Sequence, residues 1–497
     1  MHIALTGFQY LYSIGVFNTC QLNVAGTLEW GSSTSYFINL FSTLLVTGQT
    51  IGCIITGKLI DNYGRRKSMI MTDILFIIAS IVLVMPSTVC FGVGRFFVGV
   101  STGIGATLGP IYLGESTPIE MMPKVGPIIY VFSGVGMITA YALGLILPVD
   151  NIETDPKSYF WIFMFLFPAL ITAYQLFYFC YWVKYDTPQF YLSRNLSQDA
   201  ESALRLTYNE GALVQGLRRA NSEIEGKSWN GTKLSFLEMI RSKRFRKMMR
   251  VGIVFAGMQQ LAGTTAIFFY STNIFLKFGG GLYLARVLTL IIGIVNLISM
   301  VSSIWLLPLI GRKKIYVASQ IIVSILLSTM ALFSGYIQAD PIVAAVFLII
   351  YFIPCGCGII CTGWMYATEI LNDQIFSFIS SLNFAFGILV SLLFPFSVEY
   401  IGINNTFLFF SGCMALCSVY SMLDLIETKD KDKETILIGM GVIEMRVLPG
   451  GEDNNSLKSP VECEEEKNEE KSGFGGMLKG NRLNSTGFND VSLPIND

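Results

Sequence analysis

A cluster of uncharged polar residues stands inside a long apolar run of this chain. Residues 257–275, GMQQLAGTTAIFFYSTNIF, combine two adjacent glutamines with threonines, a tyrosine, a serine and an asparagine. A buried amide or hydroxyl needs a hydrogen-bond partner in a nonpolar environment, because an unpaired one costs free energy. Since amides both donate and accept hydrogen bonds, Gln259 and Gln260 suit the hydroxyl groups of a neutral solute. We therefore expect a polar solute here; the alternative is that the amides only join neighbouring helices.

No pattern in the sequence brings together residues for catalysis or metal binding. Cys355, Cys357 and Cys361 are closely spaced, as in some metal sites or disulfides. The chain has one histidine, His2, however, and the three cysteines stand inside an apolar segment, so we interpret them as small packing residues. Paired carboxylates and nucleophile–histidine pairs cannot be placed at one depth. We expect no enzyme activity, no metal and no cofactor, and no nucleic-acid binding.

The elements that position these residues are predicted from composition. Hydrophobic residues make up 52% of the chain and charged residues 14%, and the mean hydropathy is +0.56. An apolar run of about 20 residues crosses the roughly 30 Å of hydrocarbon in a bilayer as a helix. We therefore predict an all-α membrane protein with twelve transmembrane helices, at about 3–23, 36–57, 69–86, 89–112, 125–148, 159–183, 251–277, 283–309, 315–336, 341–367, 375–400 and 403–424.

Positively charged loops predict the orientation of these helices. Lysine and arginine gather at residues 58–67 and 312–314 and in the central segment, whereas the alternate loops carry mainly acidic residues. Because basic residues in short loops are retained in the cytoplasm, both termini are expected there. The first run lacks a basic leader and an obvious cleavage site, so we expect it to remain as a helix.

The second half of the sequence repeats features of the first. GKLIDNYGRRK follows the second run and LIGRKKIY the eighth, and single acidic residues close corresponding runs at nearly constant spacing. The matching pairs are Gly64 and Gly311, Glu115 and Glu369, and Asp186 and Glu427. Two similar six-helix bundles can rock about a central cavity and open it to either side in turn.

This repetition predicts four regions. They are an N-terminal six-helix bundle at 1–183, a cytoplasmic helical connector at 184–250, a C-terminal six-helix bundle at 251–424 and a disordered cytoplasmic tail at 425–497. Charged residues at the cytoplasmic helix ends are predicted to form ion pairs that latch the bundles when they close there. The predicted latch residues are Asp61, Arg65, Arg66, Arg95, Glu115, Arg312 and Glu369; the alternative is that the basic residues only fix topology.

Several segments together resemble the sugar-porter branch of the major facilitator superfamily, the family of the facilitative hexose transporters. They are GKLIDNYGRRK, GRFFVGVSTGIGATLGPIYLGESTP, YDTPQFYLSRN, GMQQLAGTTAIFFYSTNIF, GIVN and LIGRKK, within about residues 6–435. The resemblance implies two pseudo-symmetric bundles, alternating access and a monosaccharide held mainly by the C-terminal half. It implies sugar contacts at Gln259, Gln260, Thr265, Asn296, Trp364, Asn383 and Tyr130, and a gating pair at Phe269 and Tyr270.

The chain departs from the family pattern at some of these places. The tenth helix lacks the usual proline between Gly358 and Gly363, and Phe376 stands where an arginine normally partners the tenth-helix glutamate. Tyr130 replaces the usual fifth-helix glutamine. We expect a thinner C-terminal part of the latch, and therefore a lower barrier to opening or a substrate other than glucose.

Whether transport is coupled to protons is predicted from the presence or absence of acidic residues in the first and third helices. Proton-driven relatives place an aspartate where this chain has Ser13, and Asp73 is expected near the cytoplasmic rim and paired. We therefore favour a uniporter for a small neutral sugar or polyol, functional as a monomer in the lipid bilayer and located in the plasma membrane. The alternatives are a proton-coupled sugar or polyol symporter and a non-transporting sugar sensor of the same fold.

Overall fold

The computed structural model describes residues 2–118, 121, 125–150, 155–206, 213, 216–217, 228–229, 232–233, 245–277, 281–336, 341–371, 373–429, 431, 435–436 and 439–440. Residues 1–443 form one compact unit. Nearly half of the predicted connector and most of the predicted tail lie outside the described residues. The connector does contain α8 (Pro188–Leu192), α9 (Ser197–Arg205) and two short antiparallel strands, β1 (Ser228–Trp229) and β2 (Thr232–Lys233).

Six long helices form the N-terminal half of this unit. They are α1 (Leu5–Thr27), α2 (Thr34–Tyr63), α3 (Arg65–Leu83), α4 (Thr88–Ser116), α6 (Ile128–Gly144) and α7 (Phe160–Tyr181). Short 3-10 turns, η1 (His2–Ala4), η2 (Gly31–Ser33) and η4 (Pro156–Tyr159), precede α1, α2 and α7. Helix α4 packs along α2 and α3, α1 packs along α6, and α7 packs along α3.

The C-terminal half repeats this plan with two interrupted helices. Its elements are α12 (Arg246–Leu261), α13 (Thr264–Lys277), α14 (Leu282–Ile310), α15 (Arg312–Tyr336), α16 (Pro341–Pro354), the π-helical segment η7 (Cys355–Thr362), α17 (Gly363–Ile370), α18 (Asp373–Tyr400) and α19 (Ile403–Asp424). The pair α12 and α13 is the seventh crossing, and α16, η7 and α17 together make the tenth. The run predicted at 251–277 is present as one crossing, and the structure interrupts its helix at Ala262 and Gly263.

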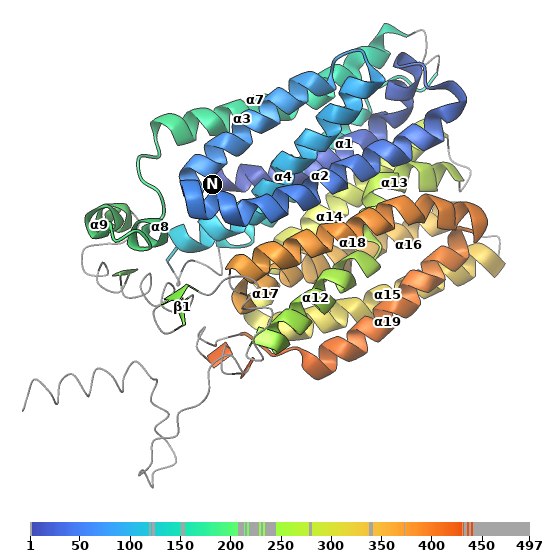
Figure 1. The fold of residues 1–497 in the computed structure, drawn as a ribbon. Coiled ribbons are helices and arrows are strands. Elements are labelled where there is room, and N and C mark those ends of the chain that lie inside the picture. Colours follow the sequence, from blue (N-terminus) through green and yellow to red (C-terminus); the bar gives the residue numbers. More distant parts are fainter. Residues whose placement is uncertain are drawn as a thin grey trace, which may run out of the picture. The chain divides into compact units, whose positions relative to one another are not determined.

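The two halves meet through equivalent helices. Helix α2 of the first half lies beside α18 of the second (Figure 1), and α14 packs against α6. Counted within each half, both contacts join a second helix to a fifth helix, so they are related by a pseudo-two-fold axis. Helices α1 and α13 add a further contact between the halves. The predicted architecture of twelve helices in two pseudo-symmetric bundles is confirmed.

The outer surface of the helices is apolar, as a lipid-facing surface must be. Among the described residues, nine helices are long and apolar enough to cross a membrane. Three crossings fall outside that set: α6 is short, α1 is rich in polar residues, and α3 begins with RRK and contains Asp73. Large apolar side chains such as Ile78, Leu170 and Leu416 are exposed on the protein surface. Exposed apolar faces on this scale fit a bilayer rather than water.

Candidate functional site

A cavity between the two halves brings together most of the predicted sugar-binding residues. Its lining includes Gln259, Gln260, Thr265, Trp364, Asn383 and Tyr130. About 840 Å³ of space between atoms lies at this cavity, part of it open to solvent. Its walls come from α1, α4 and α6 on one side and from α12, α13, α14, η7, α17 and α18 on the other.

The polar wall of the cavity is a connected set of amides. Gln260 Nε2 donates to Asn383 Oδ1 at 3.0 Å, and Thr265 Oγ1 donates to Gln260 Oε1 at 2.7 Å. Asn383 Nδ2 in turn donates to the carbonyl of Ala256 at 3.0 Å. These bonds fix the direction of each amide while leaving some of its hydrogens and lone pairs for a solute.

The break between α12 and α13 places this wall at the cavity. Gly263 adopts φ +80°, a conformation that disfavours other residues, and it ends α12 just after the two glutamines. Tyr351 Oη donates to the Ala262 carbonyl at 2.6 Å, so one carbonyl released by the break has a partner. Interrupted helices that line a cavity are typical of transporter binding sites.

The π-helical segment η7 was not foreseen from the sequence. Gln259 Nε2 donates to the Ile359 carbonyl inside this segment at 2.7 Å, and Thr362 Oγ1 donates to the Cys357 carbonyl at 2.7 Å. π-helical turns free backbone carbonyls and occur often at functional sites. The tenth crossing, which lacks a proline between Gly358 and Gly363, thus contains another irregularity next to the cavity. Cys355, Cys357 and Cys361 lie in this packed segment.

Aromatic residues form the apolar part of the wall. Trp364 borders the cavity, and its ring meets the ring of Phe376 edge-on at 6.0 Å. Phe376, which stands at the position of a family arginine, is therefore a packing residue for Trp364. The lining residues Tyr10, Phe268 and Phe384 were missed, because the sequence does not show which face of an apolar helix borders a cavity.

Asn296 is placed differently from the expectation. It lies outside the cavity lining and is fully buried, with Nδ2 3.8 Å from Met300 Sδ. A Cβ added at Gly356 of η7 would lie 2.9 Å from Asn296 Oδ1, so the asparagine packs against the π-helical segment. In this conformation Asn296 is a packing residue of η7.

The predicted gating pair also lies outside the cavity lining. Phe269 and Tyr270 are buried on α13. Tyr270 Oη donates to the Ser391 carbonyl at 3.1 Å, and its ring stacks on Phe394 with centroids 5.8 Å apart. Both residues are packed among neighbouring helices in this conformation.

Ion pairs lie within each half at the end of the bundle where α3 and α15 begin. Arg65 Nη2 pairs with Glu115 Oε1 at 2.5 Å, and Arg312 Nη2 pairs with Glu369 Oε1 at 3.0 Å. We call this end of the unit the ion-pair end. Each pair joins helices of the same half, so neither joins the two halves in this conformation.

Two carboxylates complete the same arrangement in both halves. The backbone N–H of Arg65 donates to Asp186 Oδ1 at 3.0 Å, and that of Arg312 donates to Glu427 Oε1 at 2.9 Å. Each carboxylate therefore caps the N-terminus of α3 or α15, where the helix dipole favours negative charge. Burial raises the pKa of Asp186, and its hydrogen bonds to the backbone oppose that shift. Gly64 separates α2 from α3 as Gly311 separates α14 from α15, and both have positive φ.

Three of the predicted latch residues need correction. Arg95 is fully buried near the start of α4, far from Glu115, and donates to the Ser13 carbonyl at 2.8 Å. Asp61 is exposed and, within the described part of the chain, its side chain forms no salt bridge. The Arg66 side chain donates to carbonyls at the end of α7 instead of pairing with an acid.

Hydrogen bonds between the halves gather at the opposite end of α1. Asn18 Nδ2 donates to Ser271 Oγ at 2.7 Å, and Gln21 Nε2 donates to Asn273 Oδ1 at 2.7 Å. Arg286 is missing from the sequence-based predictions. It is fully buried and donates through Nη2 to Asn23 Oδ1 at 2.6 Å and through Nη1 to the Leu147 carbonyl at 2.9 Å. Most of the polar contacts between the halves thus lie at the end opposite the ion pairs; a further one joins α18 to α2, where Ser377 Oγ donates to the Cys53 carbonyl at 2.9 Å.

Comparison with known proteins decides the family. The model of the family described as "Sugar (and other) transporter" matches residues 1–437. The chain belongs to the sugar transporter family. It is 26% identical over 446 residues to the glucose transporter GlcP of Staphylococcus epidermidis, covering 87% of this chain and 94% of that protein. It is 24% identical over 478 residues to the facilitated glucose transporter member 3 of solute carrier family 2 from Mus musculus, covering 91% and 94%.

A solved structure supports the fold of this sugar transporter. The proton:xylose symporter XylE of the major facilitator superfamily, bound to 6-bromo-6-deoxy-D-glucose, matches with a TM-score of 0.77 and 17% identity, covering 88% of this chain and 98% of that one. The match places the chain in the major facilitator fold. Members of this family move solutes without chemical change, and the chain is not an enzyme.

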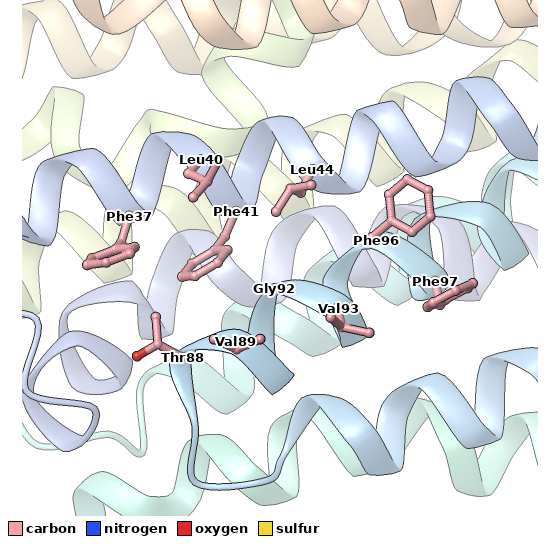
Figure 2. Close-up of a pocket in the computed structure, with 10 residues that line it drawn as sticks. All are labelled: Phe37, Leu40, Phe41, Leu44, Thr88, Val89, Gly92, Val93, Phe96 and Phe97. Atoms are coloured by element: carbon pink, nitrogen blue, oxygen red, sulfur yellow. The ribbon is translucent and has the colours of Figure 1, made fainter.

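A second hollow in this sugar transporter has no features of a sugar site. It lies between α2 and α4 and is lined by apolar side chains, with the Thr88 hydroxyl as an exception (Figure 2). Phe37, Phe41, Phe96 and Phe97 all contribute to its lining. A sugar moved there from water would leave most of its hydroxyls without partners. The cavity between the halves is therefore the candidate site.

Proposed function

We propose that this sugar transporter carries a monosaccharide by alternating access, without coupling to an ion. The observation that carries the proposal is the cavity between the halves, which is lined by the amides of Gln260 and Asn383 and by the indole ring of Trp364. A monosaccharide has hydroxyls around its rim and partly apolar faces. Amides match the first and an indole ring matches the second.

The absence of charge in the cavity supports a neutral solute. None of the described residues that line it is Asp, Glu, Lys, Arg or His. A charged solute that enters a pocket of low dielectric without a countercharge would lose its hydration and gain no ion pair to compensate. Gln259, Gln260, Thr265, Trp364, Asn383 and Tyr130 are proposed to contact the sugar.

Alternating access is supported by the distribution of contacts between the halves. The bonds of Asn18, Gln21 and Arg286 hold the halves together at one end of α1. Breaking them while new contacts form at the ion-pair end would open the cavity to the other side. We place the ion-pair end and both termini in the cytoplasm, from the basic loops, and the protein in the plasma membrane.

Uniport is favoured by the first helix. Arg95 reaches the backbone carbonyl of Ser13, and α1 contains no acidic residue that could exchange a proton beside the cavity. The glucose transporters among its relatives point to a hexose as substrate. One observation, the buried carboxyl of Asp73 on α3, favours the second candidate, proton-coupled symport.

The test is uptake of a panel of labelled sugars into proteoliposomes. We expect counterflow of at least one hexose, lost in Gln259→Ala, whose side chain lines the cavity, and retained in Gln320→Met. Gln320 is a matched control, since it is a buried glutamine of the same half outside the cavity lining. Binding without counterflow would replace the proposal with a sensor, and sugar-driven proton influx would replace uniport with symport.

A further inference from the structure

Asp73 is a buried carboxyl in the wall of the N-terminal half that the proposed function leaves without a role. Its side chain is fully buried, and neither carboxyl oxygen has a hydrogen-bond partner. It lies eight residues after Arg65 on α3, or about 12 Å along the helix axis from the ion-pair end. The expectation that Asp73 is paired near the rim is therefore wrong.

A polar group beside Asp73 is the Gln9 amide of α1, whose two hydrogens are given to α7. Gln9 Nε2 donates to Thr172 Oγ1 and to Gln175 Oε1 of α7, both at 2.9 Å. The Gln9 amide also lies close enough to the Asp73 carboxyl to interact with it, although no hydrogen bond of ordinary geometry joins the two. An amide nitrogen has two hydrogens, so Gln9 has none left for Asp73 in this arrangement. The hydroxyl of Ser101, on α4, donates to the carbonyl of Thr72.

Charged groups on the packed helices do not neutralise Asp73. Helices α1 and α7 contain no charged residue. Helix α4 contributes Arg95, bonded to Ser13, and Glu115, paired with Arg65; α2 contributes Lys58 and Asp61 near its end. Of the uncharged titratable groups, Tyr12 donates to the Met164 carbonyl. Within the described part of the chain, none of these groups forms a hydrogen bond or ion pair with Asp73.

These surroundings determine the charge of the carboxyl. An ionised carboxylate without a cation or a hydrogen-bond donor is very costly in a medium of low dielectric, and such a group takes up a proton instead. A protonated carboxyl is neutral, so its burial at this site costs much less free energy. Asp73 therefore carries a proton when the helices pack as described.

We propose that Asp73 is a proton-binding site and that transport is fastest while it is protonated. Loss of the proton to water would leave a negative charge beside Gln9 and attract the amide hydrogens now given to Thr172 and Gln175. Helix α1 would then loosen from α7. The same helix lines the sugar cavity through Thr6 and Tyr10, so a movement of α1 would alter the position of these two lining residues. The transport part of this proposal rests on the proposed function.

The test measures thermal stability and sugar uptake of the full-length protein between about pH 6 and pH 9, in wild type and Asp73→Asn. The amide is an isostere of the protonated carboxyl. We expect the melting temperature and uptake of the wild type to fall as pH rises, because deprotonation favours the unfolded chain. Asp73→Asn should lose the pH-dependent part of both, with uptake at neutral pH within about twofold of wild type.

Asp199→Asn is the matched control, since Asp199 is an exposed carboxyl on α9, and it should keep the wild-type profile. If Asp73→Asn does not fold, Asp73→Ser replaces it with the same two readouts. A flat wild-type stability profile, or an unchanged profile in the Asp73 variant, overturns the proposal. If the stability shift is present and depends on Asp73 while no sugar is transported, the proton site stands and the proposed function fails.

Discussion

The ion pair between Arg65 and Glu115 offers a sharp test of whether these charges stabilise one half or latch two halves. The perturbation is Glu115→Gln, which removes the charge and keeps the size of the side chain. Both side chains are nearly buried, with 8% of Arg65 and 6% of Glu115 exposed. Because the pair joins α3 to α4 in one half, its loss should destabilise the folded protein in every conformation.

The expected loss of unfolding free energy follows from the burial of the two side chains. Removing one partner of a buried ion pair leaves an uncompensated charge and costs about 3–5 kcal/mol. The equivalent change in the other half, Glu369→Gln, should cost about 1.5–3 kcal/mol, because 26% of the Glu369 side chain is exposed to water. The double variant Arg65→Met with Glu115→Gln removes both charges and should recover most of the loss.

The assay is equilibrium unfolding of the purified protein in detergent, with sugar uptake measured in parallel. The expected order of unfolding free energies is wild type, then Glu369→Gln, then Glu115→Gln. Two results would refute the reasoning. One is a loss below about 1 kcal/mol in Glu115→Gln, typical of an exposed pair. The other is unchanged stability with faster uptake, which would indicate a latch between the halves.

Three further predictions follow from the site and the helix ends. Gln260→Leu removes two potential hydrogen bonds to the sugar, about 1–3 kcal/mol, so Kd should rise about 5- to 150-fold in a binding assay while Gln320→Met leaves it unchanged. An unchanged Kd in Gln260→Leu would exclude this wall as the sugar contact. Gly311→Ala should lower the unfolding free energy by about 1–2 kcal/mol, since φ is +99° and the new Cβ would lie 2.8 Å from Glu427; equal stability would contradict this. Arg286→Gln should speed amide hydrogen exchange in the last turns of α1, and wild-type protection there would show that its bonds do not hold the halves together.

Long-period patterns in the sequence were enough to predict the fold. Apolar runs of membrane-spanning length and a repeated Gly–Arg motif at residues 64–66 and 311–312 reflect local requirements, namely length across hydrocarbon and a turn with positive φ. The resemblance to sugar porters then placed Gln259, Gln260 and Asn383 at the site, and the structure brings these three together.

Contacts between segments that are distant in the sequence were harder to predict from it. Arg95 was assigned to the predicted latch and instead lies buried beside α1, and Arg286 was not noticed although it joins the halves. A charged residue in an apolar helix shows that it needs a partner. Nothing in its own helix says which neighbour supplies it.

The sequence by itself determined that twelve apolar segments form two related bundles with an uncharged polar stretch in the second. Segment length, hydropathy and turn residues act locally, so they can be recognised in one dimension. Tertiary structure decided where helices break around the cavity, that Asn296 packs against η7, and that Asp73 lies without a partner. These outcomes depend on which side chains meet across helices, and burial and hydrogen bonding are fixed only when the helices pack.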